Sequence, residues 1–162
     1  MDVFLLFDVG GTSVKAAAAR LDADGPVLMD GLLLEQPTHT QGTREQILGD
    51  FRAALERLWE MADRSGTSTL AGVGYAAIGP FDYNRGISLI QGVGKYEALY
   101  GLNFMEEAAG WTRPLPKADG FRIVIRNDAA MFALGEATFG LARGYHRAMF
   151  LTLLDPGGRG QG

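Results

Sequence analysis

The chain has 162 residues, enough for one domain with a substantial hydrophobic core. Its 15 Lys and Arg against 19 Asp and Glu give a net charge of −4, and the sequence lacks the basic stripe that is usual in nucleic-acid-binding proteins. The absence of cysteine excludes disulfides, thiol catalysis and thiolate zinc sites within the chain. The apolar runs fall short of the roughly 18 residues of a membrane span, and Met1-Asp2 lacks the positive charge that begins a signal peptide. We therefore expect a cytoplasmic protein that binds neither nucleic acid nor membrane.

Hydrophobic periodicity and turn signals predict an α/β fold with a mixed sheet in the order β-β-β-α-β-α-β-α. Three strands joined by tight turns come first and predict an antiparallel meander. Helices then alternate with strands, which is typical of a sheet that carries helices on its faces. The strands predicted in this order are 3–7, 13–21, 27–35, 71–78 and 121–125, and the predicted helices are 43–64, 103–109 and 129–139. One more strand is predicted after them, at 148–154.

The helix predicted at 43–64 has the clearest pattern. Thr43 and Gln46 have the spacing of a capping box, which fixes its start. Apolar residues then recur at helical spacing and predict one buried face. The residues that we expect to be buried are Phe51, Leu55, Leu58 and Trp59.

The first candidate site follows the first predicted strand. Adjacent Gly10 and Gly11 let backbone N–H groups converge on an anion, while Thr12 adds a hydroxyl and Lys15 a positive charge. Asp8 is suited to hold Mg²⁺, directly or through water, because that ion prefers carboxylate and phosphate oxygens. The alternative is an ordinary hairpin in which the glycines only make the turn. The glycine spacing fits neither a P-loop nor a dinucleotide fingerprint.

The second candidate site is Asn127-Asp128, directly after the strand predicted at 121–125. Ligands of α/β sheets bind at the carboxyl ends of the strands. A carboxylate there can take the proton of an alcohol, and an asparagine can fix that alcohol by hydrogen bonding. The alternative is a plain helix N-cap, for which both residue types are favoured.

The third candidate site begins at Gly79-Pro80 and continues through a glycine-rich loop. Gln91, Lys95 and Tyr96 in this loop are polar groups that can line a pocket for a small ligand. The alternative is an ordinary loop, because Gly and Pro after a strand usually only make a turn.

Four segments taken together resemble the ROK family of sugar kinases and repressors, within the actin-like, ribonuclease-H-like ATPase superfamily. They resemble the family's first phosphate loop, the strand and Gly-Pro turn beside the sugar, the helix start that carries the catalytic base, and the connection to the second domain. In this chain they are residues 7–12 (FDVGGT), 72–80 (GVGYAAIGP), 127–136 (NDAAMFALGE) and 140–153.

The resemblance implies a role for each candidate residue. Asp128 would be the general base, and ATP and Mg²⁺ would be the cofactors, with Asp8 near the metal; zinc is not expected within this chain. The residues assigned to the sugar are Asn127, Gly79, Pro80 and Gln91, the last where the family often has Asn. The residues assigned to the phosphates are Asp8, Gly10, Gly11, Thr12 and Lys15.

The activity implied is ATP-dependent phosphorylation of a hexose-type sugar, as in glucokinases, fructokinases and N-acetylhexosamine kinases. The full-length family member is expected to be a homodimer. A non-catalytic sugar-binding or regulatory module is the alternative. The sequence leaves open which sugar is bound and whether polyphosphate replaces ATP.

The resemblance also predicts the domain organisation. Residues 1–140 would form the N-terminal kinase domain, 141–154 the start of a second domain, and 155–162 a tail outside the family pattern. We expect the chain to be a truncated N-terminal half that is inactive alone, and the absence of a leading helix-turn-helix favours the kinase branch. Without the second domain, the chain past residue 140 is expected to fray or self-associate. The side chains expected to lose their cover are Met131, Phe132, Leu134 and Phe139.

Overall fold

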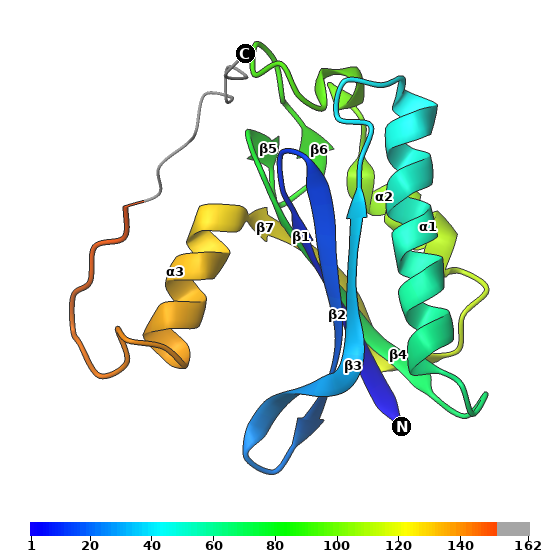
Figure 1. Cartoon of the computed structure of the whole chain (residues 1–162), viewed down its shortest axis with the longest axis vertical. Helices are drawn as coiled ribbons and strands as arrows, with labels where there is room; N and C mark the ends of the chain where they lie inside the picture. The colour runs from blue at the N-terminus through cyan, green and yellow to red at the C-terminus, as the bar shows by residue number, and fades with distance from the viewer. Residues whose placement is uncertain (152–162) are drawn as a thin grey trace, which may run out of the picture. The chain divides into compact units, whose positions relative to one another are not determined.

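The computed structural model describes residues 1–151 and forms two compact units, residues 1–128 and the residues from Ala129 onward. Within the described residues, no helix is both long enough and apolar enough to cross a membrane. The strands are β1 (Asp2–Val9), β2 (Ser13–Asp22), β3 (Gly25–Pro37), β4 (Thr69–Ala77), β5 (Phe81–Asp82), β6 (Ile87–Ser88) and β7 (Lys117–Asn127) (Figure 1). The helices are α1 (Arg44–Ala62), the short 3-10 helix η1 (Glu97–Leu99), α2 (Phe104–Thr112) and α3 (Asp128–Thr138).

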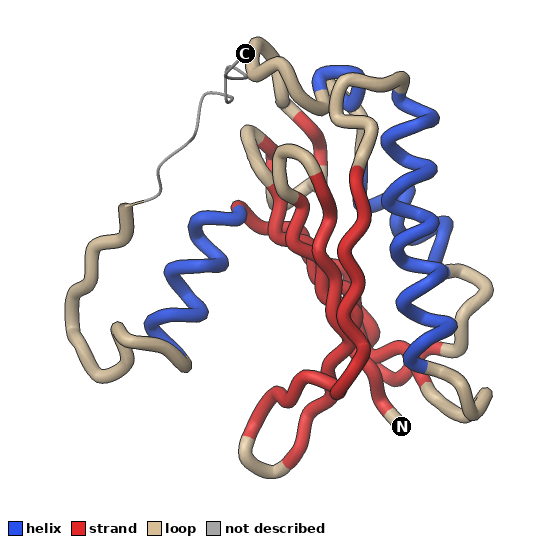
Figure 2. The backbone as a smooth tube through the Cα atoms, viewed as in Figure 1, coloured by secondary structure: helices blue, strands red, loops and turns tan. Residues whose placement is uncertain are grey.

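The first unit is built on a five-stranded mixed sheet with the strand order β3-β2-β1-β4-β7. The pairs β1–β2 and β2–β3 are antiparallel, whereas β4 lies parallel to β1 and β7 lies parallel to β4. The helices α1 and α2 lie along one face of this sheet (Figure 2). The predicted α/β class, the antiparallel meander and the mixed sheet are therefore confirmed.

The helix α1 starts where the sequence predicts. The side chain of Thr43 accepts a hydrogen bond from the Gln46 N–H at 3.3 Å, and Gln46 Oε1 accepts one from the Thr43 N–H at 2.8 Å, so the capping box is confirmed. Its apolar face packs into the core, and the four residues predicted to be buried are buried: Phe51, Leu55, Leu58 and Trp59.

Two parts of the chain differ from the prediction. The short strands β5 and β6 and the helix η1 occupy a segment that the sequence predicted as loop. The strand predicted at 148–154 is not formed over residues 148–151. A strand needs a neighbour that takes its backbone hydrogen bonds, and residues 148–151 pair with none of the described strands. Residues 152–154 and the predicted tail 155–162 lie outside the described residues, and the domain boundaries stay predictions.

The helix α3 buries none of its side chains. Phe132, Leu134 and Phe139 are 56%, 57% and 67% exposed, whereas Met131 is half-buried. Three of the four side chains expected to lack cover are therefore exposed. Self-association through them stays a prediction.

The strand β7 pairs with β4 in two registers. Leu70 lies opposite Lys117 and Gly72 lies opposite Arg122, so two positions along β4 correspond to five along β7. The extra segment contains Gly120, whose φ of 78° favours glycine. Beyond this bulge the pairing is regular as far as the end of the strand at Asn127.

Aromatic rings form a continuous chain through the core of the first unit. Phe7 stacks on Tyr75 with the ring centroids 4.8 Å apart, and Phe104 meets Tyr75 edge to face at 4.9 Å. Phe104 also meets Phe51 at 5.5 Å, and Phe51 contacts Tyr96 at 5.8 Å. The rings therefore connect the sheet to α1, α2 and the loop that contains Tyr96.

Tyr75 provides a test of the core. Its hydroxyl is buried and has no hydrogen-bond partner within the described residues; burial raises the pKa of the phenol, so the group stays protonated. Because an unpaired buried polar group costs about 1–3 kcal/mol, Tyr75→Phe is expected to raise the free energy of unfolding by about 1 kcal/mol in urea titrations followed by circular dichroism. The control is Tyr100→Phe, at a tyrosine that is 50% exposed, which is expected to change nothing. A loss of stability in Tyr75→Phe would show that the hydroxyl has a partner, such as an ordered water.

Candidate functional site

Three parallel strands end at the same level along one edge of the sheet. The register places Val9 opposite Ala77 and Ala77 opposite Asn127. Since neighbouring strands lie about 4.8 Å apart, the ends of β1 and β7 are about 10 Å apart, with β4 between them. This edge is where α/β sheets bind their ligands. The segments that follow these strand ends are residues 10–12, residues 78–80 and Asp128.

The turn between β1 and β2, called here the glycine turn (residues 10–12), is fixed by hydrogen bonds of its backbone. The hydroxyl of Tyr96 donates to the Gly10 carbonyl at 2.8 Å, and the Thr38 N–H donates to the Thr12 carbonyl at 3.2 Å. The N–H groups of Gly11 and Thr12 have no acceptor among the described residues. The Gly10 N–H also donates to the Ser13 carbonyl at 3.0 Å, so the turn is held in place while the N–H groups of Gly11 and Thr12 remain for an anionic ligand.

Tyr96 joins the glycine turn to the loop that follows β6. Its φ of 57° lies in the left-handed region, which a residue other than glycine rarely adopts. Its backbone N–H donates to the Thr40 carbonyl at 2.6 Å, and its hydroxyl oxygen lies 2.9 Å from Thr38 Oγ1. Because the single hydroxyl proton of Tyr96 goes to Gly10, Thr38 is the donor in that second bond. Burial raises the pKa of Tyr96, so this proton is retained.

Lys95 brings a cation to the glycine turn. A methyl group built on Gly11 would lie 2.6 Å from Lys95 Nζ and 3.2 Å from its Cδ. The lysine side chain therefore lies over Gly11, and a larger residue fits there only if the lysine moves. Lys15, the lysine that the sequence predicted for this role, is an exposed residue of β2 opposite Asp8.

Asp8 is an exposed carboxylate near the end of β1. It forms no ion pair with any described residue. No group of three or more His, Cys, Asp or Glu that could hold a metal ion occurs in the described part of the chain. Because Mg²⁺ in kinases is usually held by one or two carboxylates together with substrate phosphates and water, a single free carboxylate beside the glycine turn fits that ion.

Tyr83 links the Gly-Pro turn to the end of β7. A methyl group on Gly79 would lie 2.6 Å from the Tyr83 hydroxyl oxygen, and Asn127 Nδ2 donates to the same oxygen at 3.3 Å. This contact brings together two of the predicted sugar residues, Gly79 and Asn127. Asp128 follows as the half-buried first residue of α3. The sequence analysis missed Tyr83, because it lies in the β5–β6 hairpin that was predicted as loop.

The other predicted sugar residues lie on the same two loops. The Leu89 N–H donates to the Pro80 carbonyl at 3.0 Å, which ties the segment before Gln91 to the Gly-Pro turn. Gln91 itself is exposed, and no described residue contacts its side chain by a hydrogen bond. The geometry therefore places Pro80 beside the segment that carries Gln91 without a direct bond between them.

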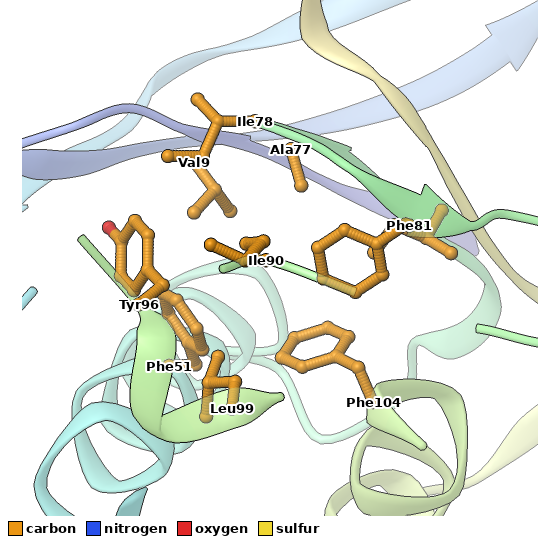
Figure 3. A pocket seen from close by; sticks show the side chains of 10 residues that line it. Val9, Phe51, Ala77, Ile78, Phe81, Ile90, Tyr96, Leu99 and Phe104 are labelled. Carbon is orange, nitrogen blue, oxygen red and sulfur yellow. The ribbon is translucent and has the colours of Figure 1, made fainter. Parts of the chain in front are cut away.

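A cavity lies in the apolar interior next to this edge (Figure 3). Its volume is about 20 Å³, room for about one water molecule. Val9, Ala77 and Phe104 are among its almost entirely apolar lining residues. A hexose is much larger and needs polar partners, so this cavity is a packing defect of the core and the candidate site is the open loop edge.

No protein-family model and no curated protein matches the chain. Solved structures do match it. A ROK family glucokinase from Streptomyces griseus, in complex with glucose and AMPPNP, is 25% identical with a TM-score of 0.60 over 88% of this chain and 38% of its own. An inorganic polyphosphate/ATP-glucomannokinase from Arthrobacter sp. strain KM is 18% identical with a TM-score of 0.66 over 90% of this chain and 51% of its own.

A ROK family transcriptional regulator, a homolog of the E. coli MLC protein, also matches, with 15% identity and a TM-score of 0.62 over 85% of this chain and 31% of its own. The chain thus spans between 31% and 51% of the length of these structures. Kinases and a regulator therefore share the arrangement seen here. The chain has the α/β fold of ROK kinases and regulators over part of their length, and the ROK resemblance inferred from the sequence is confirmed.

Proposed function

We propose that this chain is the part of a sugar kinase that holds the transferred phosphate and the acceptor sugar, and that the whole protein phosphorylates a hexose-type sugar with ATP. The observation that carries the proposal is the common level at which β1, β4 and β7 end. That register brings the glycine turn and the Asn127-Asp128 pair to one edge of the sheet. The similarity to ROK glucokinases and hexokinases supports the same assignment.

Phosphoryl transfer requires positioning, neutralisation of charge and an oriented hydroxyl rather than covalent chemistry by the protein. The glycine turn would bind the phosphate chain through the free N–H groups of Gly11 and Thr12. Asp8 would hold Mg²⁺ against the phosphates, and the ion would neutralise their charge.

The alcohol is the other half of the reaction. A sugar hydroxyl is a poor nucleophile at neutral pH, so a base must lie within hydrogen-bond reach of it. Asp128 would take its proton, while Asn127 and the loops at Gly79, Pro80 and Gln91 would bind the sugar. Tyr83 would position the Asn127 side chain through their hydrogen bond. The ends of β1 and β7 are about 10 Å apart, which leaves room for a phosphate and an acceptor hydroxyl beyond the end of β4.

A non-catalytic sugar-binding or regulatory module is the second candidate. It is favoured by the similarity to a ROK transcriptional regulator, which has the same fold over 85% of this chain. The two candidates differ in the phosphate half of the site, because a sugar sensor needs no phosphate ligand at the glycine turn.

Calorimetry with a panel of hexoses, N-acetylhexosamines and Mg·ATP separates the two candidates. For a kinase we expect the chain to bind one class of sugar and also Mg·ATP, and a form with the full two-domain length to turn both over. Asn127→Ala is expected to weaken sugar binding about tenfold or more, because the hydrogen bond of the half-buried Asn127 amide to the sugar is lost. Asn84→Ala, at an exposed asparagine in the β5–β6 turn, is the matched control. Sugar binding without any binding of Mg·ATP would favour the module, and no sugar binding would contradict both candidates.

A further inference from the structure

Lys95 is a half-buried cation beside the glycine turn, and no described carboxylate pairs with it. The other two lysines of the chain have different surroundings. Lys117 Nζ donates to the Thr112 carbonyl at 2.8 Å, and Lys15 is exposed on β2. Removing a cation partly from water without an anion is unfavourable. An anion bound at the glycine turn would therefore stabilise the charge of Lys95 where it lies over Gly11.

The backbone around Lys95 is held in place on both sides. The Gly94 N–H donates to Glu97 Oε1 at 2.7 Å, and Gln41 Nε2 donates to the Gly94 carbonyl at 3.2 Å. Tyr96 is fixed by its bonds to Thr40 and Gly10. These contacts hold the backbone of Lys95 in place in the absence of a ligand. The entropy cost of ordering this loop on binding is therefore small.

The donors at this place match a phosphate chain. The Gly11 and Thr12 N–H groups have no acceptor among the residues described, and the exposed Thr12 side chain adds a hydroxyl. Backbone N–H groups in a turn bind phosphate oxygens through directional hydrogen bonds, whereas a lysine attracts them as a point charge. The loop 94–97 and the glycine turn are more than 80 residues apart in the sequence, as the Tyr96–Gly10 bond across 86 positions shows.

We infer that Lys95 is a ligand of the phosphate chain bound at the glycine turn, and that the chain is the phosphoanhydride common to a nucleoside triphosphate and inorganic polyphosphate. This inference rests on the proposed phosphate site and adds to it the residue that supplies the charge. Lys95 takes the role that the sequence analysis gave to Lys15.

The test measures binding of tripolyphosphate and of Mg·ATP to the 162-residue chain, by calorimetry and by backbone amide NMR. Three variants are compared with the unmodified chain: Lys95→Met, Lys95→Arg, and Arg57→Met as a control that removes one exposed positive charge from α1. Lys95→Met is expected to raise the Kd for tripolyphosphate about tenfold or more, since a charge-assisted contact is lost. Lys95→Arg is expected to stay within about threefold because it keeps the charge, and Arg57→Met within about twofold because exposed charges at a distance are screened. Equal thermal midpoints show that every variant is folded.

The outcomes separate this inference from the proposed function. The inference is supported if titration with tripolyphosphate shifts the Gly11 and Thr12 amide signals and if, of the three variants, only Lys95→Met binds more weakly. Equal binding by Lys95→Met, or equal weakening by Arg57→Met, overturns it and leaves the proposed function in place. Binding of a hexose without binding of either phosphate ligand overturns both, in favour of the sugar-binding module. If Mg·ATP binds more tightly than tripolyphosphate at equal ionic strength, the phosphate chain belongs to a nucleoside triphosphate; the reverse order identifies inorganic polyphosphate.

Discussion

Asp128→Asn is expected to lower the kcat of sugar phosphorylation by about 10²–10⁴-fold, the usual contribution of a positioned general base. The amide keeps the size and much of the hydrogen bonding of the carboxylate, but it cannot accept the hydroxyl proton. The Kd for the sugar is therefore expected to change little. The measurement is a coupled assay of ADP release, with sugar binding by calorimetry, in a form of the protein that has the two-domain length of the similar structures.

The matched control is Asp119→Asn, which makes the same substitution at an exposed position in the β7 bulge. We expect it to leave both kcat and the sugar Kd unchanged. A kcat of Asp128→Asn within tenfold of the parent would remove Asp128 from the role of base. A large rise in the sugar Kd with an unchanged kcat would make it a sugar ligand instead.

Phe104→Ala is expected to lower the free energy of unfolding by about 3–5 kcal/mol, the usual cost of truncating a buried phenylalanine. Phe104 is 3% exposed and meets the rings of Phe51, Tyr75 and Trp111 edge to face. It also borders the 20 Å³ cavity, so the truncation enlarges a void that already exists. The loss is a large part of the 5–15 kcal/mol that is typical of a domain.

Urea unfolding of the 162-residue chain, followed by circular dichroism, measures this effect. The control is Phe139→Ala, at a phenylalanine that is 67% exposed, with an expected change within about 0.5 kcal/mol. A loss below about 1 kcal/mol in Phe104→Ala would show that the neighbouring rings close the gap, because the cost of such substitutions depends on how far the site collapses.

The parts of the fold that could be predicted are those with local signals. The Thr43–Gln46 capping box and the helical spacing after it give the start and the buried face of α1. The three strands of the meander follow from apolar runs separated by turn residues. The hairpin β5–β6 and the helix η1 have no such signal, because each is too short to show a period and depends on contacts with the rest of the unit.

Local signals likewise predict one part of the candidate site and not the other. The residue types of 8–12 and Asn127-Asp128 are enough to predict two ligand-binding segments. Their position at one edge of the sheet depends on the pairing of β1, β4 and β7, which residue types do not specify. Lys95 could not be distinguished from Lys15, since its position depends on a left-handed tyrosine whose hydroxyl bonds to a glycine 86 residues earlier. Local propensity carries no information about a contact of that range.

The bulge of β7 determines where the length of this chain can change. Residues 118–121 lie between the single Leu70–Lys117 pair and the regular pairing that begins at Arg122, and they already hold more chain than the neighbouring strand requires. An insertion or deletion there alters only the size of the bulge, whereas one residue more or less after Arg122 would shift Asn127 by one position and turn its side chain to the opposite face of the sheet. Length variation among relatives of this protein is therefore expected in the first half of β7 and not in the half that leads to the site.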